Sequence, residues 1–358
     1  MNKSSLRQQV GASLVPAVAV ALGLAVGAML ILLQGKNPGS AVLAVYHGAL
    51  DGWGPFGRTL EKATPLVLTG CAIIVGLKAG LFNIGAQGQL VMGAVFSAWA
   101  GFRFHGLSPA VHVPFALLVG ALAGAVPAAF AGFLKAKRGV HEVITTIMLN
   151  SVIVAIADWL ASRPWRSKTA AFSKTPTIEP SAVIGRVSKL PLGFALAVAA
   201  ALGLWVVITR TTFGFRLASV GQNRNAAHYA GIPVGRVTIS ALALSGMLAG
   251  IGGAVETLGV LGHYEQNSSP TLGFDGITIA LLSKLSPRAT IPAAILIGAM
   301  RAADTKLQSE AKVAPEIVSV IVAVILLFVA APALLRWITK RTGGADEAGL
   351  QLTGGWGS

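Results

Sequence analysis

Three amide side chains interrupt an otherwise apolar part of the sequence. Asn83, Gln87 and Gln89 lie within residues 80–89, Gly-Leu-Phe-Asn-Ile-Gly-Ala-Gln-Gly-Gln, between two apolar runs. Because an amide both donates and accepts hydrogen bonds, this set suits a neutral polar solute better than an ion. Glycine costs about 1 kcal/mol relative to alanine inside a helix, so the three glycines indicate a break between two half-helices. The alternative is an ordinary tight turn whose amides cap helix ends.

A second polar stripe follows in residues 142–150. Glu142, Thr146 and Asn150 are spaced four residues apart and therefore share one face of a predicted helix. Polar side chains inside a membrane usually face the interior of a helix bundle and mark a pathway. The alternative is hydrogen bonding between helices, at about 0.6 kcal/mol for each contact. We favour a pathway role for Asn150 and a structural role for Glu142, which lies near a positive helix N-terminus.

The third distinctive segment is a basic loop over residues 211–236. Within it, residues 218–231 form a helix-compatible stretch with several small side chains, and Gly231 and Pro233 end that stretch. Small side chains on such a helix let the groove of another protein approach closely. The alternative is an amphipathic helix that lies on a membrane surface.

Motifs for nucleotide hydrolysis or other enzyme chemistry are absent from the sequence. It contains no GxxxxGK(S/T) phosphate loop, since Gly35-Lys36 is followed by Asn37 and lacks the upstream glycine. The six histidines have no metal-ligand spacing, and a single cysteine, Cys71, allows no disulfide within the chain. We therefore expect no enzyme activity, no metal and no cofactor in this chain.

The composition indicates which elements must position these side chains. Of 358 residues, 54% are hydrophobic and 11% are charged, whereas soluble domains average about 25% charged residues. The net charge of +15 comes from Lys and Arg between apolar runs, which suits contact with anionic lipid head groups rather than nucleic acid. The predicted fold is all-α, a polytopic transmembrane helix bundle of about ten spans. It forms one domain over residues 1–341, followed by a disordered tail over 342–358.

The predicted spans differ in length. They cover residues 11–33, 63–80, 87–102, 111–134, 142–162, 190–209, 237–258, 272–285, 290–303 and 316–335. A straight crossing needs about 20 residues, so the spans near 87–102, 272–285 and 290–303 are expected to be broken, re-entrant or buried in protein. Basic clusters at 135–138 and 336–341 place both termini in the cytoplasm.

Glycines at GxxxG spacing recur in the predicted spans. Such pairs let helix backbones approach closely, and we assign them to packing inside the bundle rather than to dimerisation. They are Gly23/Gly27, Gly76/Gly80, Gly120/Gly124 and Gly246/Gly250.

Together these segments resemble the permeases of ABC importers, in the branch that covers simple sugars, branched-chain amino acids and nucleosides. Residues 221–232, Gly-Gln-Asn-Arg-Asn-Ala-Ala-His-Tyr-Ala-Gly-Ile, are similar to the cytoplasmic coupling segment of that branch. Residues 80–89, 142–150 and 273–282 are similar to its nucleoside permeases, whereas sugar permeases tend to carry an Asp-Leu-Ser pattern. One departure leaves the structure of the local turn undetermined by the resemblance, because Lys284 and Arg288 flank Pro287 where the subgroup often has Gly, Asn and Gly.

The resemblance implies the substrate-conducting subunit of an ATP-driven importer in the bacterial inner membrane, with nucleosides as the expected substrates. Its expected partners are a second, related permease chain, a cytosolic ATPase that binds ATP and Mg²⁺, and an extracytoplasmic substrate-binding protein. The expected pathway residues are Phe82, Asn83, Gln87, Gln89, Thr146, Asn150, Phe274 and Asp275. The expected ATPase-coupling residues are Gly221, Gln222, Asn223, Ala226, Ala227, Tyr229 and Gly231.

Two alternative functions remain open from the sequence. The first is a permease for a simple sugar or another small polar solute. The second is a self-contained secondary transporter, which would need ion-coupling acids near the middle of the membrane. The candidates for that role are Asp158 and Glu256, and both lie near the predicted outer ends of their spans.

Overall fold

The computed structural model describes residues 3–170, 172–187, 189–266, 268, 271–314 and 316–330, with side chains from residue 17 onward. The expected tail over 342–358 and the end of the last predicted span lie outside these residues. The α-helices and strands in chain order are α1 (Lys3–Leu33), α2 (Pro38–Ala49), α3 (Trp53–Lys78), α4 (Ala86–Arg103), α5 (Pro109–Arg138), α6 (Glu142–Ser162), β1 (Arg186–Val187), β2 (Leu190–Pro191), α7 (Leu192–Arg210), α8 (Thr212–Gln222), α9 (Arg224–Tyr229), α10 (Val234–Glu256), α11 (Leu272–Leu282), α12 (Thr290–Ala302), α13 (Asp304–Glu310) and α14 (Glu316–Ala330).

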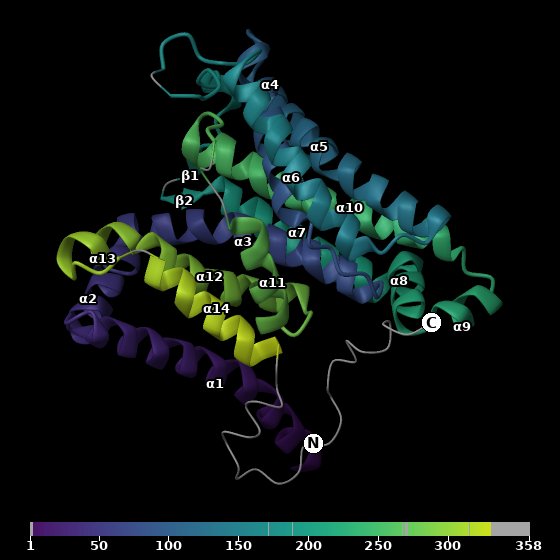
Figure 1. Cartoon of the computed structure of the whole chain (residues 1–358), viewed down its shortest axis with the longest axis horizontal. Coiled ribbons are helices and arrows are strands. Elements are labelled where there is room, and N and C mark those ends of the chain that lie inside the picture. Colours follow the sequence, from purple (N-terminus) through teal and green to yellow (C-terminus); the bar gives the residue numbers. More distant parts are fainter. Residues whose placement is uncertain are drawn as a thin grey trace.

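The described chain is a helix bundle, as the sequence predicts, and every predicted span overlaps a helix (Figure 1). By length and composition, five of the described helices could cross a membrane: α3, α5, α6, α7 and the helix over Val234–Leu261. A sixth candidate is a bent pair, in which Leu272–Leu282 and the segment Pro287–Glu310 meet at 119°. The expected breaks near 272–285 and 290–303 match this bent pair. By contrast, α4 is one continuous helix, and most of its residues are buried.

Four helices form the centre of the bundle, because glycine lets their backbones touch. Helix α10 packs against α3, α4 and α5. A Cβ atom at Gly93 of α4 would lie 2.1 Å from the carbonyl oxygen of Gly250, and one at Gly124 of α5 would lie 2.4 Å from that of Gly246. At the edge of the bundle, Gly23 and Gly27 of α1 lie against α14 (Figure 1). Three of the predicted pairs, Gly23/Gly27, Gly120/Gly124 and Gly246/Gly250, therefore serve packing between helices of this chain, as predicted.

The turn between α11 and α12 contains the residues that depart from the expected family pattern. Lys284 and Leu285 adopt left-handed backbone, with φ of 52° and 56°. An L-residue there costs about 1–2 kcal/mol relative to glycine. The Arg288 guanidinium lies over the Trp205 ring of α7, 3.0 Å from its centroid. The turn thus forms without the glycines usual at this place, and the contact with Trp205 ties it to α7.

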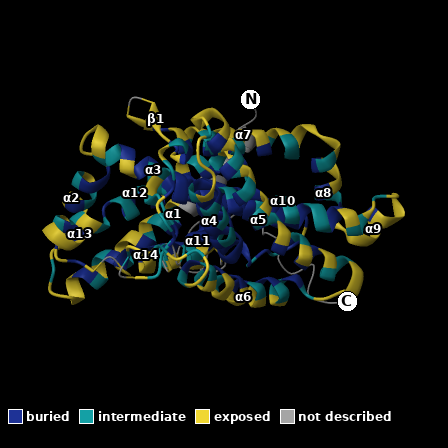
Figure 2. Cartoon of the chain, turned by 90° about the horizontal axis from the view of Figure 1, so that it is seen from above, coloured by how far each residue is buried: buried dark blue, intermediate teal, exposed yellow. Residues whose placement is uncertain are grey.

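One end of the bundle carries two short helices, α8 and α9. The side chain of Asn223 caps α9 by accepting a hydrogen bond from the backbone N–H of Ala226 at 2.9 Å. Helix α9 extends from the body of the protein with most of its residues exposed (Figure 2). Lys135 at the end of α5 pairs with Glu142 at the start of α6, 2.9 Å apart, and Gly235 at the start of α10 lies beside Ala136.

Candidate functional site

The amides of residues 80–89 divide into two groups. Asn83 and Gln89 bond to each other reciprocally: Asn83 Nδ2 donates to Gln89 Oε1 at 2.8 Å, and Gln89 Nε2 donates to Asn83 Oδ1 at 3.0 Å. Asn83 Nδ2 also donates to the Ser245 hydroxyl at 2.8 Å, and that hydroxyl donates to the Ala72 carbonyl of α3 at 2.6 Å. This pair therefore fastens the segment to α3 and α10, which is a structural role for Asn83 and Gln89.

Helix α6 contributes the polar face that its spacing predicts. Glu142, Thr146 and Asn150 are all buried. Asn150 Oδ1 accepts from the Gly88 N–H at 2.8 Å, and its Nδ2 donates to the Ile84 carbonyl at 2.9 Å. The Thr146 hydroxyl donates to the Glu142 carbonyl at 2.8 Å. Asn150 thus positions the start of α4, where Gln87 lies.

A cavity of about 540 Å³ opens between α4, α6, α10 and the segment that follows α10. Three of the expected pathway residues line it: Gln87, Asn150 and Phe274. The others, Phe82, Asn83, Gln89, Thr146 and Asp275, lie outside its lining. Its remaining walls are Leu90, Val91, Ala94, Ser151, Val154, Ala155, Asp158, Gly253, Glu256, Thr257, Leu261, Tyr264, Glu265 and Ser268.

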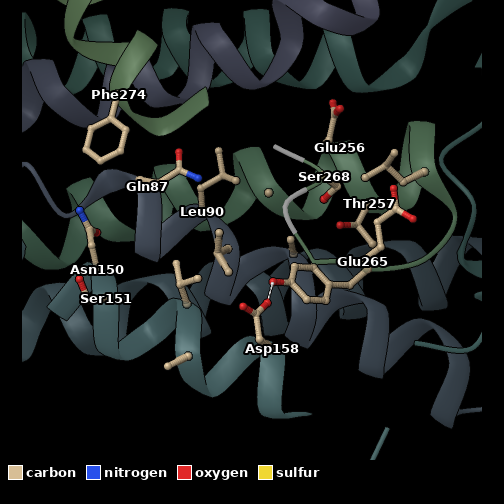
Figure 3. Close-up of a pocket in the computed structure, with 17 residues that line it drawn as sticks. Gln87, Leu90, Asn150, Ser151, Asp158, Glu256, Thr257, Glu265, Ser268 and Phe274 are labelled. Atoms are coloured by element: carbon tan, nitrogen blue, oxygen red, sulfur yellow. Dashed lines mark hydrogen bonds between the residues drawn. The ribbon is translucent and has the colours of Figure 1, made fainter. Parts of the chain in front are cut away.

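The cavity has two chemically different ends (Figure 3). At one end Gln87, Asn150 and the ring of Phe274 lie close together. Asp158 lies eight residues beyond Asn150 on α6, about 12 Å along the helix at 1.5 Å per residue. At that far end lie the carboxylates of Glu256 and Glu265 (Figure 3). Apolar side chains of α4, among them Leu90, line the wall between the two ends.

Tyr264 and Asp158 form a hydrogen-bonded pair at the carboxylate end. The Tyr264 hydroxyl donates to Asp158 Oδ1 at 3.2 Å, and Gln266 Nε2 donates to Asp158 Oδ2 at 2.9 Å. Burial, together with the neighbouring carboxylate, raises the pKa of the Tyr264 phenol above its ordinary value. The phenol therefore stays protonated and donates to Asp158 throughout the physiological pH range.

Glu256 ends α10 at the same end of the cavity. Its side chain is 3% exposed, and Oε1 accepts a hydrogen bond from Lys62 Nζ of α3 at 3.3 Å. A π-helical turn, Thr257–Leu261, follows directly, and such turns are frequent at functional sites. From the sequence, Glu256 is a candidate only for ion coupling, because an acidic residue inside an apolar span is rare without a function.

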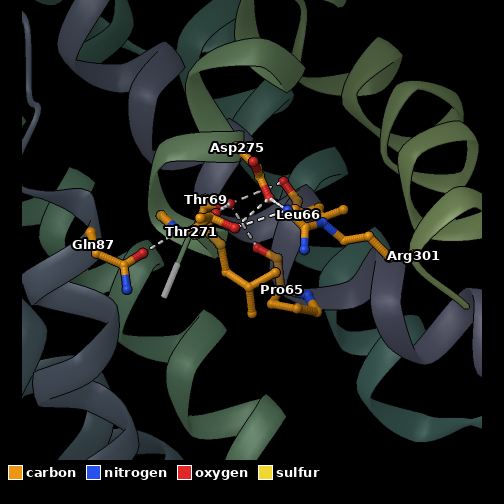
Figure 4. Close-up of polar contacts among 9 residues, drawn as sticks. Pro65, Leu66, Thr69, Gln87, Thr271, Asp275 and Arg301 are labelled. Carbon is orange, nitrogen blue, oxygen red and sulfur yellow. Dashed lines mark hydrogen bonds and ion pairs between the residues drawn. The ribbon is translucent and has the colours of Figure 1, made fainter. Parts of the chain in front are cut away.

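Asp275 lies outside the lining of the cavity and forms an ion pair with Arg301 of α12 (Figure 4). Arg301 also donates to the Thr271 hydroxyl at 2.9 Å. Gln87 Oε1 accepts from the backbone N–H of Gly273 at 2.7 Å, so the cavity wall is bonded to the first turn of α11. Arg301 is not among the site residues expected from the sequence, although an arginine within an apolar run is a signal for one.

The expected coupling segment lies on α8, α9 and the turns beside them. Ala226 is exposed and Tyr229 is 90% exposed, as a docking surface requires. Gln222, Asn223 and Gly231 are exposed as well. The expectation that both alanines are accessible is wrong for Ala227, which is 4% exposed. One side of this single-turn helix must pack on the bundle, and Ala227 is on that side.

Gly221 connects the coupling segment with the amide segment. A Cβ atom at Gly221 would lie 2.2 Å from the Lys78 carbonyl oxygen, and one at Gly80 would lie 3.1 Å from the Gly221 carbonyl oxygen. Gly80 has φ +67°, a conformation that glycine adopts without strain. The backbone of the coupling segment thus touches the backbone at Gly80, nine residues before Gln89. Gly80 begins the segment that leads to the cavity.

Titratable side chains do not gather into a metal site in the described residues, where no group of three or more His, Cys, Asp or Glu could hold a metal ion. The polar groups of the cavity are amides, carboxylates and hydroxyls. This arrangement can bind a polar organic solute through hydrogen bonds.

Comparison with known proteins identifies relatives over most of the chain. The family described as branched-chain amino acid transport system / permease component matches residues 56–330. A guanosine ABC transporter permease protein, NupP, of Bacillus subtilis (strain 168) is 36% identical, with 91% of this chain and 95% of that protein covered. A nucleoside ABC transporter permease protein, NupB, of Lactococcus lactis subsp. cremoris (strain MG1363) is 31% identical, with 88% and 90% covered. A glucose ABC transporter permease protein, TsgB13, of Haloferax volcanii is also 31% identical, with 87% and 86% covered.

Proposed function

Because the chain belongs to the family of branched-chain amino acid transport system permease components, we propose that it forms the substrate pathway of an ATP-driven importer of nucleosides. A permease component of a transport system is a multi-pass membrane protein and not an enzyme. The substrate class rests on two relatives, which are named for guanosine and nucleoside transport and match this chain almost end to end.

The observation that carries the proposal is the cavity beside α4. Its volume of about 540 Å³ lies within the range of small-molecule sites, about 300–1,000 Å³. A nucleoside has a flat aromatic base with amide-like edges and a sugar with hydroxyl groups. The cavity offers an aromatic ring at Phe274, the amides of Gln87 and Asn150, and an apolar wall on α4.

The energy would come from a separate ATPase. The exposed part of α8 and α9 is the proposed docking site, and the ATPase subunit would bind the ATP and Mg²⁺. In the proposed importer, that end of the bundle and both termini would lie in the cytoplasm of a bacterial cell. A second, related permease chain and an extracytoplasmic substrate-binding protein would complete the importer.

A simple sugar is the second candidate substrate. It is favoured by the relative from Haloferax volcanii that is named for glucose transport. A secondary transporter is a weaker reading, because both candidate ion-coupling acids have partners: Asp158 binds Tyr264 and Gln266, and Glu256 binds Lys62.

Competition for uptake tests the substrate class. The chain and its partner subunits would be expressed in cells that lack their own nucleoside uptake, and the initial rate of labelled guanosine entry measured. We expect unlabelled nucleosides to suppress entry, and glucose, ribose and leucine to leave it unchanged. Uptake of labelled glucose without any uptake of guanosine would move the substrate to the sugar class. Uptake of neither compound by cells that contain the assembled transporter would refute both assignments.

A further inference from the structure

The first turn of α11 carries three consecutive residues with three different partners. The backbone N–H of Gly273 donates to Gln87 Oε1 at 2.7 Å. Phe274, the next residue, lines the cavity at the end where Gln87 lies (Figure 3). The carboxylate of Asp275 forms an ion pair with Arg301 of α12. One turn of helix thus joins two side chains of the cavity wall to a charged group outside that wall.

Arg301 bonds to this turn at two places, one before Phe274 and one after it. Its Nη2 donates to the Thr271 hydroxyl at 2.9 Å and to Oδ2 of Asp275 (Figure 4). The side chains of Asp275 and Arg301 are 10% and 16% exposed, so the ion pair lies largely out of water. Arg301 does not line the cavity. Any effect of Arg301 on a bound solute must therefore pass through other residues.

Backbone packing holds the turn against α3 and α4. The Thr69 hydroxyl of α3 donates to the Leu272 carbonyl at 3.3 Å. A Cβ atom at Gly276 would lie 2.7 Å from Thr69 Cβ, and one at Gly273 would lie 2.3 Å from Gln87 Cα. These contacts fix how closely α11 approaches its neighbours. They do not involve the two side chains that Arg301 binds.

The side chains of Thr271 and Asp275 depend on Arg301 for their charge balance. They bond to each other at 3.4 Å, but a hydroxyl alone does not compensate a carboxylate that lies away from water. Among the described residues, the hydrogen bonds of the Arg301 guanidinium go to this turn, and its Nε has no partner there. An ionised pair at such a place in an apolar bundle is rare without a function.

We propose that Arg301 is a positioning residue for the end of the cavity where Phe274 and Gln87 lie. Through Thr271 and Asp275 it fixes the first turn of α11, and that turn sets the place of the Phe274 ring. A solute that packs on the ring then lies at a fixed distance from the Gln87 amide. The inference rests on the function proposed above only in taking the solute to be a nucleoside.

Arg301→Lys tests the positioning role, because it keeps the positive charge but replaces the planar guanidinium with a shorter side chain that ends in one ammonium. Initial guanosine uptake should fall roughly tenfold, since hydrogen bonds between charged groups are the stronger ones. The amount of folded protein in the membrane should stay near that of the wild type. Arg186→Lys makes the same change at the ion pair with Glu61, outside this cavity, and should leave uptake unchanged. Wild-type uptake by Arg301→Lys would overturn the proposal.

A double-mutant cycle with Phe274→Ala separates positioning from a general loss of structure. If Arg301 acts through the Phe274 ring, the two substitutions remove the same contribution and their effects do not multiply. Arg301→Lys should then lower uptake by less than about threefold in the Phe274→Ala background. The same tenfold factor in both backgrounds would show that Arg301 acts elsewhere and would overturn the proposal.

A second readout needs no substrate. Phe274→Cys places a thiol on the turn, while the native Cys71 is buried. Adding Arg301→Lys should raise the rate at which a charged thiol reagent labels this cysteine by about threefold or more, because a released turn opens more often. Thr271→Val removes one of the two bonds without changing a charge, and it should raise the rate less.

Labelling of Phe274→Cys at one rate, with and without these substitutions, would overturn the positioning role. A wild-type chain that labels as expected but does not transport guanosine would refute the proposed substrate and leave Arg301 as the residue that positions the turn.

Discussion

Gly253→Ala should strongly destabilise the folded membrane protein. A Cβ atom at Gly253 of α10 would lie 1.9 Å from the carbonyl oxygen of Leu90 and 2.9 Å from the backbone nitrogen of Ala94. Both atoms belong to the backbone of α4, so no side-chain rotation relieves the clash, and the two helices must separate. Overpacking a core typically costs about 1–3 kcal/mol, and we expect a loss at the upper end of that range. Close helix packing is also the main attraction between helices in a membrane.

Gly203→Ala of α7 is the matched control, because a Cβ atom there meets no other atom within 4 Å. Thermal unfolding of the purified chains in detergent, followed by size-exclusion chromatography, gives the measurement. The control should be as stable as the wild type or slightly more so, since alanine favours helix over glycine. A Gly253→Ala protein with the wild-type unfolding midpoint would show that α4 and α10 are not in backbone contact.

Ala226→Trp should abolish ATP-driven uptake while the membrane domain stays folded. Ala226 is exposed on α9, so a large side chain there changes the surface and not the interior. If an ATPase groove packs on this helix, the indole must clash with it or push it open. The motion of the ATPase would then no longer be transmitted to the bundle through the backbone contact of Gly221 with Lys78 and Gly80. We expect uptake to fall at least tenfold, together with co-purification of the ATPase subunit.

Two further tryptophan variants give this experiment its controls. Ala110→Trp places the same side chain at an exposed position near the start of α5. That helix has 30 residues, about 45 Å at 1.5 Å per residue, and its other end lies beside α10. Ala110→Trp should therefore leave ATPase binding intact. Ala227→Trp should reduce folding instead, because Ala227 is buried. Full binding of the ATPase and full uptake by Ala226→Trp would exclude α9 as the docking site.

The helices and the family were predictable from local patterns. Long apolar runs fix the positions of the spans, and four-residue spacing placed Glu142, Thr146 and Asn150 on one buried face. The resemblance that the motifs carried is confirmed by the family match. The number of spans does not follow from the hydrophobic pattern alone, because the bent pair of α11 and α12 appears in the sequence as two separate short apolar runs.

The details of the site depend on contacts between distant parts of the chain. Lys62 reaches Glu256 across 194 residues, and Arg301 reaches Asp275 from another helix, so neither pair has a local signature. The sequence does not distinguish the role of the Asn83 and Gln89 amides from that of the Gln87 amide, yet the first two bond to each other. The burial of Ala227 follows from which side of one short helix faces the bundle. The sequence therefore indicates which segments matter but not which side chains line the cavity.

Protection of a cysteine in the cavity tests the central claim most directly. The native chain has one cysteine, Cys71, and it is buried. Ser151→Cys would place a reactive thiol on the cavity wall, and Thr169→Cys would place one in the exposed loop that follows α6. In the assembled, energised transporter, guanosine should slow labelling of the first thiol by a charged thiol reagent and leave the second unchanged. Labelling of Ser151→Cys at the same rate with and without guanosine, in membranes that transport it, would contradict the account.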